Sequence, residues 1–133
     1  MQNLIYALIQ VIHNFGAAAI VGIGAYRICF VRAGAAPRTA LLLAVVWALQ
    51  ALSGVCFGIA TYYYDRQLPD IHGVAVDALA VKVICAALGF ALAAACAKWG
   101  SGWSAQRSSL TWGASFALGA AALSAAAFLR WFS

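Results

Sequence analysis

Four long apolar segments follow one another along the chain, and only short polar segments separate them. They cover approximately residues 3–30, 39–64, 73–97 and 110–132. Each exceeds the about 20 residues that a helix needs to cross ~30 Å of hydrocarbon. Hydrophobic residues make up 66% of the 133 residues and charged residues 8%, a composition with which a soluble domain would aggregate. The sequence therefore predicts an integral membrane protein.

The expected fold follows from the behaviour of the backbone in lipid. Every backbone polar group within hydrocarbon must be hydrogen-bonded internally, so each apolar segment is expected to be a helix. Short joints make successive helices antiparallel neighbours. The predicted fold is an all-α, up-and-down four-helix bundle that forms a single transmembrane domain over residues 1–133. The first segment lacks the basic start of a signal peptide, so we expect it to be retained as a span.

Basic residues collect at two of the three joints. Arg27, Arg32 and Arg38 flank the first joint, and Lys98 and Arg107 flank the third. Short loops rich in Lys and Arg stay in the cytoplasm, so both termini are predicted to lie outside. We expect a multi-pass protein of the bacterial inner (cytoplasmic) membrane, with the lipid bilayer as its surroundings. No nucleic-acid partner is expected, because these basic residues flank spans and do not alternate with aromatic residues.

Small residues recur at helical spacing within the spans. They let membrane helices approach closely where lipid provides no hydrophobic drive for association. The small-residue face of the fourth span is the predicted docking surface for another membrane subunit. The positions are Gly16, Gly22 and Gly24 in the first span, the GxxxG pair Gly54 and Gly58 in the second, and Gly113, Ala117 and Ala121 in the fourth.

Several polar residues lie within the apolar spans, where such groups usually face the bundle interior. A helix rises ~1.5 Å per residue, so His13, Ser53 and Lys82 are predicted to share one level in the outer half of the bundle. His72 and Asp77 should lie nearer the outer surface. Asp77 is about 140° around the helix axis from Lys82, so the two cannot point at one spot. The polar set is His13, Asn14, Gln50, Ser53, Asp77 and Lys82.

Each candidate site residue has a structural and a functional interpretation, and the sequence leaves both open. His13 is either a core histidine that hydrogen-bonds Ser53 or a backbone carbonyl, or a ligand to a metal or haem. Lys82 either extends its stem toward the outer surface or pairs with Asp77 or an anionic ligand. His72 is either a solvated residue at the start of the third span or a second metal ligand.

The cysteines all lie in the spans or at their ends, and none belongs to a CxxC motif. Disulfide exchange is therefore not indicated. We interpret the cysteines as small apolar core residues, and the alternative is a path for a soft metal such as Cu(I) through Cys56 and Cys85. The four are Cys29, Cys56, Cys85 and Cys96.

Three short motifs contain the candidate residues: IHNFGAAAIVGIG in the first span, QALSGVCFG in the second and HGVAVDALAVKVICAAL in the third. Together they resemble the CopD-type copper-resistance membrane proteins and, more distantly, the bacterial four-helix protoporphyrinogen oxidase. The resemblance covers the first three spans. It implies that His13 contacts copper or haem and that Lys82 is a polar partner at the same level. The chain departs from the family pattern at His72, where tyrosine is usual, and at Lys98 and Trp99, where Asn-Arg is common.

Two classes of function follow from these observations. In the first, His13, Ser53 and Lys82 contact a cofactor, either copper or haem b, and His13 and His72 serve as metal ligands. In the second, the chain is a non-catalytic accessory or structural subunit of a larger membrane redox or photosynthetic complex. An enzyme that acts alone is less favoured, because the polar set is sparse and no catalytic residue is assigned.

Overall fold

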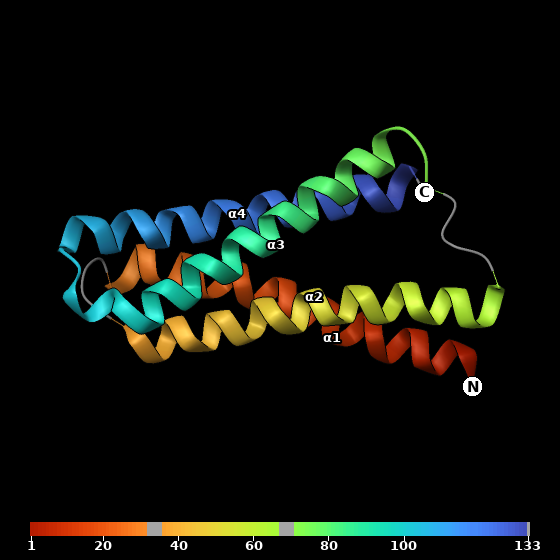
Figure 1. The fold of residues 1–133 in the computed structure, drawn as a ribbon, viewed down its shortest axis with the longest axis horizontal. Coiled ribbons are helices and arrows are strands. Elements are labelled where there is room, and N and C mark those ends of the chain that lie inside the picture. The colour runs from red at the N-terminus through yellow and green to blue at the C-terminus, as the bar shows by residue number, and fades with distance from the viewer. Residues whose placement is uncertain (32–35, 67–70, 133) are drawn as a thin grey trace.

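The computed structural model describes residues 1–31, 36–66 and 71–132 (Figure 1). Four candidate spans of 28 to 30 residues are long and apolar enough to cross a membrane, and the first and third of them include a short turn after the helix. The predicted all-α fold class is therefore confirmed. The elements are α1 (Gln2–Tyr26), the π-helical turn η1 (Arg27–Val31), α2 (Pro37–Asp65), α3 (Val74–Trp99), the 3-10 turn η2 (Gly100–Gly102) and α4 (Ala105–Phe132).

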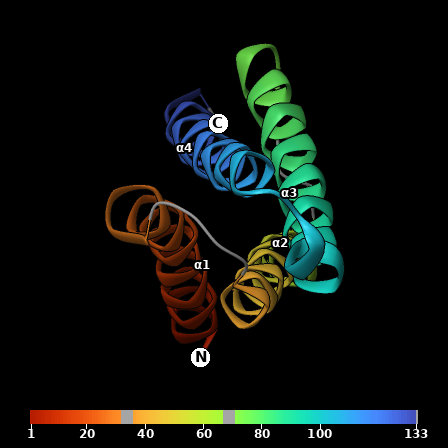
Figure 2. The same ribbon diagram turned by 90° about the vertical axis from the view of Figure 1, so that its left-hand side faces the viewer.

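The helices pack in chain order, and α4 returns to contact α1. Both chain termini lie at one end of the bundle, together with the end of α2 and the start of α3 (Figure 1). We call this the terminal end, and the opposite end, which contains η2 and the start of α2, the joint end. The α1–α2 hairpin and the α3–α4 hairpin are close at the joint end and diverge toward the terminal end (Figures 1 and 2).

The apolar core lies in the half of the bundle nearest the joint end. Its largest fully buried side chain is that of Trp47, which is 1% exposed. Gly89 of α3 lets this indole pack directly on the helix backbone, because a Cβ at Gly89 would lie 2.3 Å from Trp47 Cε2. The buried cluster consists of Ile20, Ala40, Leu43, Ala44, Trp47, Ala93, Cys96 and Trp112.

Glycines also mark the closest approach of α1 and α4. A Cβ at Gly24 would lie 3.0 Å from Phe116 Cβ, and a Cβ at Gly119 would lie 2.7 Å from Ile20 Cγ2. By contrast, a Cβ at Gly58 would meet no described atom within 4 Å, and a Cβ at Gly54 would make only an ordinary contact, 3.9 Å from His13 Cε1, so the GxxxG pair of α2 is not a site of close helix approach. Small residues occur on several faces of these Ala-rich helices, and only a face turned toward a neighbour produces a contact.

Arg27 is buried at the joint end of the bundle. It is 7% exposed, and its guanidinium carbon lies 4.8 Å from the centroid of the Trp112 ring, which is a cation–π contact. Trp112 is also buried, so this tryptophan of α4 faces protein and not lipid.

Large apolar side chains cover the outer surface of the bundle. Phe15, Leu52, Val83 and Leu110, one from each long helix, are all more than half exposed. A soluble protein would hide most such side chains, whereas hydrocarbon is a favourable solvent for them. The surface is thus compatible with contact with a lipid bilayer.

Candidate functional site

Four polar side chains from three helices meet inside the bundle, and we call them the His13 cluster. They are His13 of α1, Gln50 and Ser53 of α2, and Lys82 of α3. His13 Nδ1 lies 2.7 Å from Ser53 Oγ. His13 Nε2 lies 2.8 Å from Lys82 Nζ and 3.0 Å from Gln50 Nε2. The imidazole is therefore the centre of the cluster and contacts each of the other three residues.

The hydrogen-bond network assigns the tautomer of His13. The Ser53 hydroxyl donates its single hydrogen to the backbone carbonyl of Gln50, at 3.0 Å. Ser53 Oγ must therefore accept from His13 Nδ1–H. Nε2 then carries the lone pair and accepts N–H groups from Lys82 and Gln50. The result is a neutral imidazole whose ring orientation is fixed by α2 and whose basic nitrogen is directed at a lysine of the opposite hairpin.

Local sequence spacing builds the cluster. Gln50 and Ser53 are three residues apart, so they lie on one face of α2, and both are less than a tenth exposed. His13 and Gly16 are likewise three apart on α1. A Cβ at Gly16 would lie 2.6 Å from Gln50 Oε1, so the missing side chain makes room for the carboxamide. The IHNFG motif thus supplies both the imidazole and the space beside it.

Lys82 reaches from α3 to α1, where its Nζ contacts His13 Nε2. It shares its face of α3 with the buried residues Ala78 and Cys85, as the helical spacing predicts. Its ammonium group contacts His13 and does not extend to the outer surface, whereas Asp77 is exposed in the first turn of α3. The contact with His13 therefore favours neither extension of Lys82 to the outer surface nor its pairing with Asp77, and pairing with an anionic ligand stays a prediction.

The predicted common level of His13, Ser53 and Lys82 is confirmed by their contacts. Their role as cofactor ligands stays a prediction. Gln50 completes the cluster and was identified only as a polar residue of the second span, although its spacing of three from Ser53 placed it on the same face. Asn14 lies outside the cluster, because it accepts a hydrogen bond from Gln10 on an exposed part of α1, at 2.9 Å.

His72 is not part of the cluster. It is exposed just before α3, and its carbonyl accepts a hydrogen bond from the backbone N–H of Ala75, at 3.2 Å. From Val74 to Lys82 the helix rises about 12 Å, so the two histidines do not form one metal site. Within residues 1–31, 36–66 and 71–132, no three or more His, Cys, Asp or Glu side chains are grouped to hold a metal ion.

All four cysteines are free thiols. Cys85 and Cys96 are buried, as expected of small apolar core residues, Cys56 is partly buried and Cys29 is exposed. The proposed soft-metal path through Cys56 and Cys85 stays a prediction.

No protein-family model matches the chain, and no curated protein or solved structure matches it either. The site is therefore interpreted from its own geometry. Its chemical capacity is that of an oriented nitrogen base in apolar surroundings, next to one cationic side chain. Such a base can bind a Lewis acid or accept a proton.

Proposed function

We propose that the chain handles a cofactor in the membrane in the manner of the CopD-type proteins, and that the cofactor is a haem b held by the His13 cluster. The observation that carries this proposal is the orientation of His13. A metal-binding histidine almost always donates its second ring N–H to an oxygen acceptor, which fixes the ring and the tautomer. Ser53 Oγ accepts that hydrogen at 2.7 Å and leaves Nε2 as the binding atom.

The available donors suit haem better than copper. A b-type haem needs one or two axial side chains, and imidazole is a frequent one. Cu(I) prefers thiolate or thioether ligands, and the cluster contains neither. The described residues also lack a group of three metal-binding side chains. A bound haem would supply one-electron or oxygen chemistry at this level of the membrane.

The other members of the cluster have separate tasks in this proposal. Ser53 holds the imidazole ring in place. Lys82 and Gln50 donate N–H groups to Nε2, and they would have to release this nitrogen for His13 to hold a haem. The Lys82 ammonium would then be available to pair with an anionic group of the ligand, since a charge-assisted hydrogen bond is roughly twice as strong as a neutral one. A lysine ammonium in hydrocarbon has a high free-energy cost unless it has a partner. The presence of Lys82 at this depth therefore favours a functional role for this residue.

The test is an absorption spectrum of purified protein after incubation with haem. We expect the wild type to show a Soret band and one bound haem per chain. His13→Ala should lose the Soret band and the bound haem, and Lys82→Met should retain less haem than the wild type. His72→Ala is the matched control, because it removes the other histidine without touching the cluster and should leave the band unchanged. Haem retention by both His13→Ala and Lys82→Met would contradict the proposal. Stoichiometric copper in place of haem would refute the choice of cofactor.

The accessory-subunit function is the second candidate, and one surface of α4 favours it. A Cβ at Gly113 would meet no described atom within 4 Å, and Ala117 and Ala121 are exposed. This face can therefore take a closely packed helix of a larger complex. In that case the His13 cluster ties α1, α2 and α3 together. Purified protein without haem or copper that co-purifies stoichiometrically with a membrane complex would support this function.

A further inference from the structure

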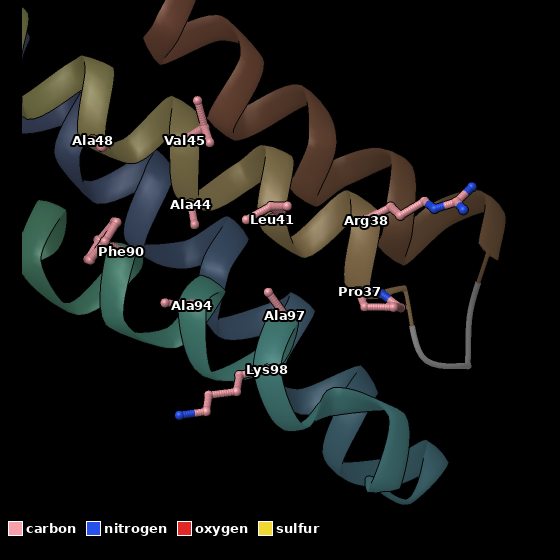
Figure 3. Close-up of a pocket in the computed structure, with 10 residues that line it drawn as sticks. All are labelled: Pro37, Arg38, Leu41, Ala44, Val45, Ala48, Phe90, Ala94, Ala97 and Lys98. Carbon is pink, nitrogen blue, oxygen red and sulfur yellow. The ribbon is translucent and has the colours of Figure 1, made fainter.

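A groove lies between α2 and α3 near the joint end, and none of its lining residues belongs to the His13 cluster (Figure 3). Its volume is about 560 Å³, within the roughly 300–1,000 Å³ typical of ligand sites. Leu41, Val45 and Phe90 line it, and each of the three is at least 45% exposed. Alanines such as Ala48 and Ala94 are also part of the lining. Its lining is thus apolar over most of its length.

The length of the groove matches one leaflet of a bilayer. On α2 it extends from Arg38 to Ala48, ten residues that rise about 15 Å. Half of the ~30 Å hydrocarbon thickness is also about 15 Å. An acyl chain that starts at the membrane surface by Arg38 would therefore follow the groove to the middle of the bilayer.

Both charged residues of the groove are basic, and both lie at its joint end. Arg38 comes from the start of α2 and Lys98 from the end of α3, and Figure 3 shows their charged ends directed away from each other. The Lys98 ammonium lies 4.8 Å from the centroid of the Trp99 ring, and tryptophan is typical of the headgroup layer. Asp65 is the last residue of α2 and Asp77 lies in the first turn of α3, so both acidic residues that the structure describes are at the terminal end. No acidic side chain among the described residues therefore lies at the basic end to neutralise Arg38 and Lys98.

We propose that this groove binds one anionic phospholipid, with an acyl chain along Leu41, Val45 and Phe90 and the phosphate between Arg38 and Lys98. The side chains of Arg38 and Lys98 are long and flexible, so both can turn toward a headgroup. Basic pockets between transmembrane helices bind anionic headgroups in this way. The proposal is independent of the haem proposal, because it rests on other residues at the surface of α2 and α3.

The test is native mass spectrometry of the purified protein titrated with phosphatidylglycerol and with phosphatidylcholine. Each basic residue near a membrane surface contributes an affinity factor of about fivefold for anionic lipid. We expect Arg38→Gln with Lys98→Gln to weaken phosphatidylglycerol binding by about 25-fold and to leave phosphatidylcholine unchanged. Arg107→Gln is the matched control, because Arg107 is a basic residue near the joint end but outside the groove. This variant should keep the preference for phosphatidylglycerol over phosphatidylcholine.

A second pair of variants tests the acyl-chain part of the groove. Ala94→Phe should fill it and reduce the binding of both lipids, whereas Ala121→Phe, on the exposed face of α4, should not. Equal affinity of the wild type for the two lipids would overturn the proposal, and so would unchanged binding by the charge variant. A third result would also overturn the proposal. If two copies of the Leu41→Cys variant form a disulfide with each other in vesicles and retain no lipid, the groove is occupied by a second chain and not by a phospholipid.

Discussion

Replacement of Gly89 by alanine tests the packing that holds α2 against α3. The new Cβ would lie 2.3 Å from Cε2 and 2.5 Å from Cζ2 of Trp47. Ordinary van der Waals contact begins at 3.4 Å, so the indole or the helix must move by about 1 Å. Trp47 is 1% exposed and has little room to move. Overpacking of this kind costs about 1 to 3 kcal/mol of stability.

Gly58→Ala is the matched control for this substitution. Gly58 is also a glycine within a membrane helix, but a Cβ there would meet no described atom within 4 Å. Both substitutions gain the same helix propensity, about 0.8 to 1.0 kcal/mol in favour of alanine. The difference between the two variants therefore isolates the clash with Trp47, and Gly89→Ala should be the less stable by about 1 to 3 kcal/mol.

The assay is unfolding by titration with sodium dodecyl sulfate in mixed micelles, followed by far-UV circular dichroism. The smaller ring of Trp47→Phe should relieve the clash, so Gly89→Ala should be less destabilising in that background. Trp47 Nε1 is buried without a hydrogen-bond partner among the described residues, so phenylalanine breaks no hydrogen bond. Equal stability of the two alanine variants, or no relief by Trp47→Phe, would refute the packing argument.

Two further predictions concern the site and the orientation of the chain. Ser53→Ala removes the acceptor of His13 Nδ1–H and should lower the stability of the protein by about 0.6 to 1.7 kcal/mol in the same titration. Ser124→Ala is the control and should have no effect, because it loses only an exposed hydroxyl bonded to the Ala120 carbonyl. Equal losses of stability in the two variants would contradict the role of Ser53 in holding His13. A cysteine at Ser104, exposed between α3 and α4, should be labelled only from the cytoplasm in a background without native cysteines, and labelling from outside would reverse the predicted topology.

The sequence predicted the helical architecture and most of the candidate site. Hydropathy and bilayer thickness fix where a span lies along the chain, and the helical rise converts residue number into depth. That was enough to predict that His13, Ser53 and Lys82 share a level and that Lys82 faces the same way as Cys85. The depth of a residue in the membrane depends only on its position along the helix, and every helix that spans the bilayer has the same thickness to cross. These predictions therefore needed no knowledge of how the helices are rotated.

Only the tertiary structure decided which faces meet. In lipid the outer and inner faces of a helix are both apolar, so hydropathy alone contains little information about rotation about the helix axis. The GxxxG spacing of α2 does not by itself identify a contact, and in the structure a buried indole packs closely on the backbone at Gly89 instead of at Gly58. The contact between Lys82 and His13 likewise depends on the rotation of three helices. Packing of side-chain volumes sets that rotation, whereas the apolar pattern along the chain sets only the spans.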